Sequence, residues 1–349
     1  MIKLFFVTDI HGSNVCYRKF LNALPIYGAD VAVLLGDLTG KVLVPLVEKG
    51  NDTWECTLMG QHRDIATKDE LAEIKKITEN AGYYWVHQTR EEFEDTRSDP
   101  AKIDALFKSL VFARVQEWLD LADERLEGKP YQMYMCPGND DWFVIDDMID
   151  NAKLVHPCDK RVVQIDNHEM VTSSYANPTP WQTPREMSEE DLETHLRGLT
   201  SQIKNQETAI YNFHVPPYGY SLDLCPKLDE NLTMAADEKI HAGSLGAKKL
   251  IEENQPLLGL FGHIHESRGA QRPAARCSST RAASTRRASS RASSSCWTRR
   301  RSRTTSSPPG EPGVDSTLRT RRRTRKGAID TYGTVHPAEG YPARPLSQA

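Results

Sequence analysis

The chain has 349 residues, a formal net charge of −4 and 38% hydrophobic residues, enough for one large domain or two smaller ones. Its seven cysteines have no regular spacing, which argues against a disulfide framework and fits a reducing compartment. No apolar run reaches the ~18 residues of a membrane span, and the opening MIKLFFVTDIHG is not typical of a signal peptide. We therefore expect a cytoplasmic protein without a membrane partner.

The small net charge hides two regions of opposite sign. Residues 268–326 contain 16 Arg and one Lys against two acidic residues, whereas residues 1–267 contain 26 basic and 44 acidic residues. An acidic body of net charge −18 is thus joined to a basic segment of net charge +15. The body is expected to attract cations and to repel nucleic acid, and the basic segment to do the reverse.

Five short apolar runs each end in polar residues. The runs cover residues 2–7, 30–35, 131–136, 209–213 and 256–261. Runs of this length bounded by turn residues predict buried strands. The residues that follow them are of metal-binding and acid–base types: Asp9, His11, Asp37, Asn139, Asp140, His214, His263 and His265. Five strands that deliver such groups from their carboxyl ends predict one site on the rim of a sheet.

Amphipathic helices are predicted between these strands. The 3.6-residue period is clear over residues 14–27, 68–82, 101–127 and 188–206. Two further strands are predicted at residues 161–166 and 169–174. Residues 42–128 hold a possible hairpin followed by helices, and we interpret them as a helical insertion beside the site.

The polar residues are informative as a set. A lone histidine is more often a satisfied core residue than a ligand, and His62, His87, His156, His168, His195, His241 and His336 are interpreted in that way. Seven ligand-type residues at five strand ends are a different case, because burying them together without a cation is costly. The set therefore predicts a metal site.

These residues lie in five motifs: DIHG at 9–12, GDLTGK at 36–41, PGNDD at 137–141, HVPPYG at 214–219 and GHIHE at 262–266. Together and in this order, the motifs resemble the calcineurin-like metallophosphoesterase family across residues 1–267. The GNDD and GHIHES forms are most similar to a little-characterised bacterial and archaeal branch of predicted phosphoesterases. The resemblance implies an α/β fold, namely a four-layer α/β/β/α sandwich with a two-metal centre on its rim.

The resemblance also implies how the ligands are shared between two divalent ions. Asp37 would bridge the ions, with Asp9, His11 and His265 completing one site and Asn139, His214 and His263 completing the other. Oxygen and imidazole ligands suit Mn, Fe, Zn, Ni or Co rather than Ca. Two such ions about 3.5–4 Å apart can activate water and polarise a phosphoryl oxygen.

Three further residues have candidate roles. Much of the family has histidine where this chain has Asp140, beside the candidate catalytic residue and ligand Asn139. Asp140 is either a general acid, which requires a raised pKa, or a group that orients a ligand. Tyr218 and Arg268 are candidate contacts for substrate phosphate, and the alternatives are a packed aromatic ring and a solvated surface charge.

Residues 268–349 form a basic Arg/Ser/Ala-rich tail in which apolar residues have no regular spacing. The sequence is compatible with three interpretations of this tail. The tail is an arm that binds nucleic acid through phosphate neutralisation, an inert disordered segment, or the product of a shifted reading frame. Codons that encode residues 277–310 can also be translated in a frame that starts at the third base of each codon. In that frame they permit a turn and two strands with alternating apolar and polar residues. We favour the shifted frame, in which the tail replaces the strands that close the body.

The function expected from the motifs is a dinuclear metal-dependent phosphoesterase. It would hydrolyse a small phosphomonoester or phosphodiester with metal-activated water. Two alternatives belong to other classes: a non-catalytic interaction scaffold of the same fold, and a nucleic-acid binder that works through the basic tail.

Overall fold

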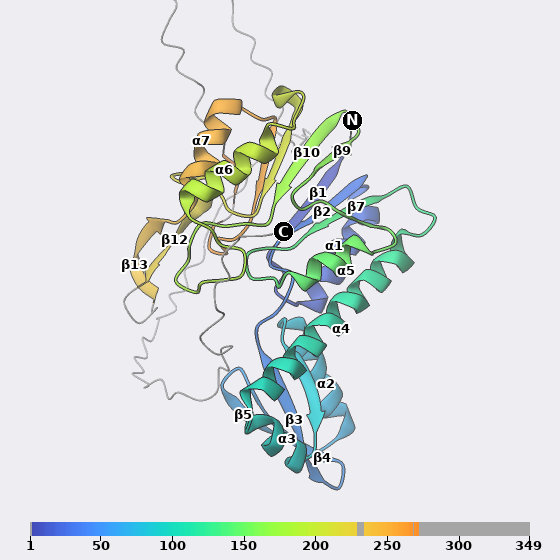
Figure 1. Ribbon diagram of the computed structural model, residues 1–349. Coiled ribbons are helices and arrows are strands. Elements are labelled where there is room, and N and C mark those ends of the chain that lie inside the picture. Colours follow the sequence, from blue (N-terminus) through green and yellow to red (C-terminus); the bar gives the residue numbers. More distant parts are fainter. Residues whose placement is uncertain (1, 229–233, 268, 272–349) are drawn as a thin grey trace, which may run out of the picture. The chain divides into compact units, whose positions relative to one another are not determined.

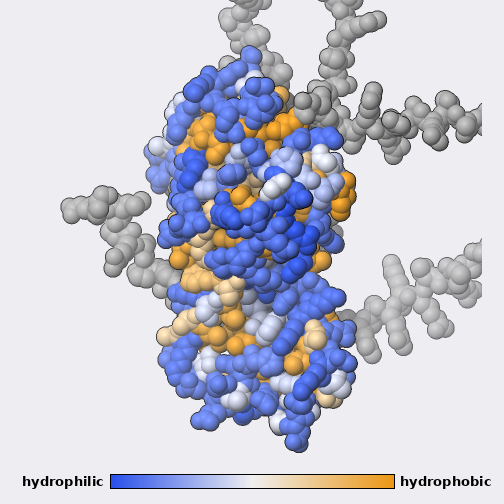
Figure 2. Space-filling view, turned by 90° about the vertical axis from the view of Figure 1, so that its right-hand side faces the viewer, coloured by the Kyte–Doolittle hydropathy of each residue, from blue (hydrophilic) through white to orange (hydrophobic). Residues whose placement is uncertain are grey.

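The computed structural model describes residues 2–228, 234–267 and 269–271 and has a mixed α/β fold (Figure 1). Residues 268 and 272–349, and with them Arg268, His336 and nearly all of the basic tail, lie outside the described residues. Within the described part, no helix is both long and apolar enough to cross a membrane. On the face shown in Figure 2, hydrophilic residues surround several separate apolar patches.

The seven predicted strands, together with one short strand at Val155–Pro157 that was not predicted, form two four-stranded sheets. The first has the order β1-β2-β7-β8 with every pair parallel, and the second has the order β14-β11-β10-β9 with only β9 antiparallel. The first sheet comprises β1 (Leu4–Thr8), β2 (Val31–Leu35), β7 (Gln132–Cys136) and β8 (Val155–Pro157). The second comprises β9 (Val162–Ile165), β10 (His168–Ser173), β11 (Ile210–Phe213) and β14 (Leu258–Phe261).

Each sheet buries both faces, which explains why its strands read as continuous apolar runs. In β2, Ala32 and Leu34 pack in a core with α1 (Asn14–Tyr27), α4 (Pro100–Leu126) and α5 (Val144–Asp150). The alternate residues Val31, Val33 and Leu35 pack in a second core with β9, β10, β11 and β14 of the other sheet. Alternate side chains of β2 point to opposite faces of the sheet, so one set packs in the helix-facing core and the other in the sheet-facing core.

The second sheet has a helix-facing core of its own. Side chains of β10 and β11 pack there against α6 (Glu189–Thr200) and α7 (Leu245–Asn254). The predicted helix at residues 188–206 is therefore confirmed, although it ends at Thr200 and a 3-10 turn follows at Gln206–Thr208. Helix α1 matches its predicted range and is capped by Ser13 and by Gly28, which adopts the left-handed conformation.

The prediction of a helical insertion is incomplete, because residues 42–128 also contain a four-stranded sheet of order β5-β4-β3-β6. Its strands are β3 (Leu43–Gly50), β4 (Thr53–Leu58), β5 (Gln61–Ile65) and β6 (Tyr84–Gln88), and its other helices are α2 (Lys68–Asn80) and α3 (Arg90–Arg97). Pro45 lies inside β3 and β5 is almost wholly polar, so neither segment has the sequence pattern of a strand. The insertion has its own apolar core around Leu46, Trp54 and Leu58.

Strand β14 is the edge of its sheet within the described residues, where it pairs with β11 alone. An unpaired edge at this strand is what the shifted-frame interpretation predicts for a body that lacks its closing strands. The loop after this edge strand carries His263 and His265.

Candidate metal centre

The predicted convergence of strand ends is present in the structure. Asp9 follows β1, Asp37 follows β2 and Asn139 lies just after β7, all in the first sheet. The second sheet contributes His214 after β11 and His263 after β14. Both sheets therefore deliver polar side chains from the carboxyl ends of their parallel strands to one place.

Four of these residues have a strained backbone. The φ angles of Asp9, His11, Asp37 and His263 are 54°, 40°, 45° and 71°, in the left-handed region that non-glycine residues rarely adopt. Such conformations cost about 1–3 kcal/mol each and persist where the surrounding structure fixes them. Four of the eleven non-glycine residues with positive φ in the described part of the chain lie at this one rim, which makes it a candidate functional site.

The first ligand group, which we call the outer group, consists of Asp9, His11, Asp37 and His265, whose ligand atoms lie within 4.8 Å of one another. The Nε2 atoms of His11 and His265 are 2.8 Å apart. His265 Nε2 is also 3.6 Å from an oxygen of Asp9. Two ring nitrogens at this distance must share a proton or coordinate a cation.

The second ligand group, which we call the inner group, consists of Asp37, His214 and His263, again within 4.8 Å, together with Asn139. The side-chain oxygen of Asn139 lies 2.8 Å from His214 Nε2 and 2.9 Å from His263 Nδ1. His214 Nε2 is 3.3 Å from Asp37 Oδ1. Asp37 thus belongs to both groups.

The electrostatics of the centre follow from the burial of Asp37. Burial alone would raise its pKa, but the neighbouring His214 holds the pKa of this carboxyl well below its usual range. Burial conversely opposes the charged form of His214, and Asp37 overcomes it and raises the pKa of the ring to about 9. For His263, burial and the charge of His214 lower the pKa to about 4. The cluster therefore contains a buried anion that requires a proton or a cation.

The donor set fits a pair of divalent transition-metal ions. The two ligand groups share one carboxylate, and the remaining donors are imidazoles, one further carboxylate and one amide oxygen. Borderline nitrogen and hard oxygen donors in this mixture suit Mn, Fe, Zn, Ni or Co. The seven predicted ligands are all brought together by the structure.

Gly262 is required for the loop that carries His263. A Cβ atom at this position would lie 2.1 Å from Thr8 Oγ1 and 2.5 Å from Asp9 Oδ2, so any side chain would displace the strand end. The close approach lets the backbone N–H of His263 donate to Asp9 at 3.0 Å. Asp9 is thereby held in place by the loop that supplies other ligands.

Two residues that sequence reasoning missed, Thr183 and Glu186, belong to the site. The side-chain NH₂ of Asn139 donates to Thr183 Oγ1 at 2.7 Å, and the hydroxyl of Thr183 donates to Glu186 at 2.6 Å. This chain of donors fixes the amide so that its oxygen faces His214 and His263. The two residues lie in an irregular segment, whose polar composition carries no period that could reveal them.

The loop after β7 has two further supports. The buried carboxylate of Asp141 accepts hydrogen bonds from the backbone N–H groups of Leu38, Thr39 and Gly138 and from the hydroxyl of Thr39. It therefore ties the Asn139 loop to the Asp37 loop. The wholly buried Arg185 donates to the carbonyls of Asp141 and Trp142 and to the carboxylate of Asp146.

Asp140 lies directly beside Asp37, the carboxylate that both ligand groups share. Its backbone N–H donates to Asp37 Oδ1 at 3.1 Å, and its side chain forms an ion pair with Lys41. Burial and the charge of Asp37 raise the pKa of Asp140 to about 6, against the opposing effect of Lys41. Of the two candidate substrate contacts, Tyr218 is 38% exposed, and Arg268 lies outside the described residues.

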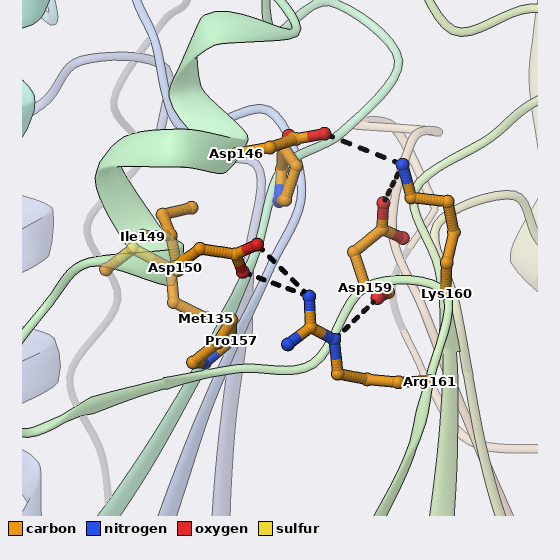
Figure 3. Close-up of a pocket in the computed structure, with 9 residues that line it drawn as sticks. Met135, Asp146, Ile149, Asp150, Pro157, Asp159, Lys160 and Arg161 are labelled. Carbon is orange, nitrogen blue, oxygen red and sulfur yellow. Dashed lines mark hydrogen bonds and ion pairs between the residues drawn. The ribbon is translucent and has the colours of Figure 1, made fainter. Parts of the chain in front are cut away.

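A small pocket is lined by Met135 of β7, by Pro137, and by residues of α5, β8 and the segment that follows β8 (Figure 3). Its charged groups are paired with one another. Arg161 donates to Asp150 at 3.0 Å, and Lys160 lies 3.6 Å and 3.7 Å from Asp146 and Asp159. The pocket therefore offers no unpaired charge for a ligand.

A third cluster of metal-ligand types lies in the insertion and comprises Glu55, His62 and Asp64. Glu55 forms an ion pair with Arg90, and Asp64 forms one with Lys49 at 2.7 Å. Asp64 is exposed and Glu55 is partly buried, and both carboxylates are neutralised by cationic side chains, so this cluster is explained as a set of ion pairs.

Comparison with known proteins leaves the family open. No family model matches the chain. An uncharacterized protein of Methanocaldococcus jannaschii is 30% identical over 153 residues, which are 43% of this chain and 64% of that protein. The chain thus spans somewhat less than two thirds of the length of this relative.

Two solved structures show a weak likeness. One is a crystal structure with a TM-score of 0.42 and 13% identity, covering 77% of this chain and 86% of the other. The second, the crystal structure of the protein TT1561 of Thermus thermophilus, has a TM-score of 0.41 and 12% identity, covering 75% of this chain and 81% of the other. At these scores the likeness names no family and assigns no activity.

Proposed function

We propose that the chain is a metal-dependent phosphoesterase of the calcineurin-like type, which hydrolyses a small phosphate ester at a dinuclear centre. The observation that carries the proposal is the sharing of Asp37 between two groups of metal-ligand side chains. One bridging carboxylate between two nitrogen- and oxygen-rich groups is the arrangement that holds two ions a few ångströms apart.

The proposed chemistry divides between the ions and the chain. When bound, two divalent ions would supply Lewis acidity and lower the pKa of water for attack on phosphorus. The residues that would hold these ions include Asp9, His11 and Asp37, whose backbone is strained, and Asn139, whose amide is fixed by Thr183. Asp140 would donate a proton to the leaving group, a role consistent with the raised pKa of its buried carboxyl.

The proposed four-layer sandwich is supported by the three apolar cores. One core lies between α1, α4, α5 and the first sheet, one contains residues of both sheets, and one lies between the second sheet and α6 and α7. Cores of this composition are expected of helix, sheet, sheet and helix layers.

The test combines metal content with activity. The purified chain should bind two equivalents of Mn²⁺ or Zn²⁺ and should hydrolyse p-nitrophenyl phosphate or bis-p-nitrophenyl phosphate, with activity lost in EDTA and restored by the metal. Asp52→Ala is a matched control, because Asp52 is an exposed carboxylate paired with Lys68 outside the centre. Binding of two metals without hydrolysis of either ester would favour the non-catalytic scaffold.

A further inference from the structure

His241, which the sequence alone assigned to a structural role, is held by a buried carboxylate. Asp223 is fully buried and its Oδ1 accepts from His241 Nδ1 at 2.6 Å. The other oxygen of Asp223 accepts from the backbone N–H groups of Gly219 and Gly243 at 2.9 and 3.1 Å. With the carboxylate fixed on several sides, the imidazole is held with its Nδ1 engaged and its Nε2 left for another partner.

Tyr218 lies beside His241, and Lys248 lies beside Tyr218. The ring of Tyr218 lies 5.6 Å from the ring of His241, and Lys248 Nζ lies 5.9 Å from the Tyr218 ring. The side chain of His241 is 36% exposed and Tyr218 is 38% exposed. Within the described residues, His241 is hydrogen-bonded through Nδ1 alone, and neither its Nε2 nor Lys248 Nζ has a hydrogen-bond or carboxylate partner. Among the described residues, Lys248 Nζ thus has the face of the Tyr218 ring but no carboxylate beside it, and such an ammonium group is suited to an anion.

This cluster is connected to both loops that carry inner-group histidines. Tyr218 follows His214 by four residues, and its backbone N–H donates to Ser244 at 3.0 Å. On the other side, the hydroxyl of Ser267 donates at 2.7 Å to the carbonyl of Leu224, which pairs with His241. The hairpin of β12 (Leu224–Leu228) and β13 (Met234–His241) therefore begins between the His214 loop and the His263 loop.

We propose that Tyr218, His241 and Lys248 bind a second phosphate group of the substrate, next to the metal centre that cleaves the first. The inference rests on the proposed phosphoesterase function and names its substrate class, a phosphate ester with a further phosphate. Three separate donors, an imidazole N–H, a phenol and an ammonium, match the several acceptor oxygens of a phosphate better than the two of a carboxylate.

The first test measures binding without catalysis. Inorganic phosphate is titrated into the chelator-treated full-length protein while the imidazole nitrogen signals of His241 are followed by NMR. We expect a saturable shift that acetate does not reproduce, that Lys248→Gln removes and that Lys249→Gln keeps. Lys249 is a matched control because it pairs with Glu193 and follows Lys248 on the same helix. The absence of a shift, an equal response to acetate, or an equal loss in Lys249→Gln would overturn the proposal.

The NMR shift of His241 tests the phosphate site independently of the proposed phosphoesterase activity. In Asp37→Ala, which lacks the bridging carboxylate, the phosphate-dependent shift of His241 should remain. If the protein binds phosphate at His241 but hydrolyses no ester, the phosphate site is supported and the proposed phosphoesterase function is refuted.

The second test uses a matched pair of substrates, glucose 1-phosphate and glucose 1,6-bisphosphate. Lys248→Gln and His241→Gln should each raise KM for the bisphosphate roughly 10–100-fold, the range of a hydrogen bond to a charged group. Neither change should alter KM for the monophosphate or kcat for either substrate. Equal effects on both substrates, or none, would contradict the assignment.

Discussion

The outer and inner ligand groups share Asp37 but differ in their access to solvent. The side chains of His265 and His11 in the outer group are 53% and 25% exposed. In the inner group, His214 is fully buried and Asn139 is 3% exposed. Both groups have supporting hydrogen bonds, to Asn139 through Thr183 in the inner group and to Asp9 from the Thr8 hydroxyl in the outer group. The difference in exposure indicates a buried inner site beside a more accessible outer site.

The largest effect should come from removing the residue that both groups share. Asp37→Ala takes the bridging carboxylate from the outer and inner groups together, so we expect loss of both bound metals and of hydrolysis. Metal analysis of the dialysed variant, beside the Asp52→Ala control, measures this. If two metals stay bound in Asp37→Ala, the two groups do not form one centre.

Asp140 tests whether catalysis depends on a carboxyl next to the shared residue. As a general acid, it should contribute about 10²–10⁴-fold to esters with poor leaving groups, and Asp140→Asn should spare p-nitrophenyl esters. Because the acid form is required, the rate on poor leaving groups should fall as pH rises through the pKa of Asp140, which is about 6 without metals. Bound divalent ions would move this fall to lower pH.

Rates for the two kinds of ester across pH, in wild type and in Asp140→Asn, decide between the two roles. An equal loss on both kinds of ester would assign Asp140 to positioning, through its backbone N–H bond to Asp37 and its ion pair with Lys41.

Thr183 tests whether the support of the inner group matters. Thr183→Val removes the acceptor for the Asn139 amide and should weaken metal binding by the inner group about 10–100-fold, as is typical for partners of ligands. Thr183→Ser keeps the hydroxyl and should restore the affinity. Calorimetric titration with Zn²⁺ resolves the two sites, and melting of the metal-free variants reveals any general loss of stability. Identical affinities in the Val and Ser variants would show that the hydrogen bond has no part in metal binding.

The smallest expected effect concerns metal release. Because the outer group is the more exposed, EDTA should remove its metal faster than that of the inner group and give two kinetic phases. His265→Ala should abolish the fast phase and keep the slow one. A single phase in the wild type would mean that the two ions leave together and that exposure does not distinguish the groups.

Much of the centre could be predicted from the sequence because its residues follow directly after buried strands. Asp9, Asp37 and His214 each lie at the end of a short apolar run, and parallel strands end at the same edge of a sheet. The sheet of the insertion was harder to predict, because β3 contains Pro45 and β5 is polar, so neither has the sequence pattern of a strand.

The sequence by itself determined the strand ends, the seven ligand types and the contrast between an acidic body and a basic tail. Only the tertiary structure decided which side chains hold the ligand loops and His241 in place. Thr183, Arg185 and Asp223 reach their partners across 44, 44 and 18 residues of chain. Local periodicity reports which face of a strand or helix is buried, but it carries no information on partners that meet through irregular loops. Those contacts depend on how the two sheets and their loops pack, which no local pattern specifies.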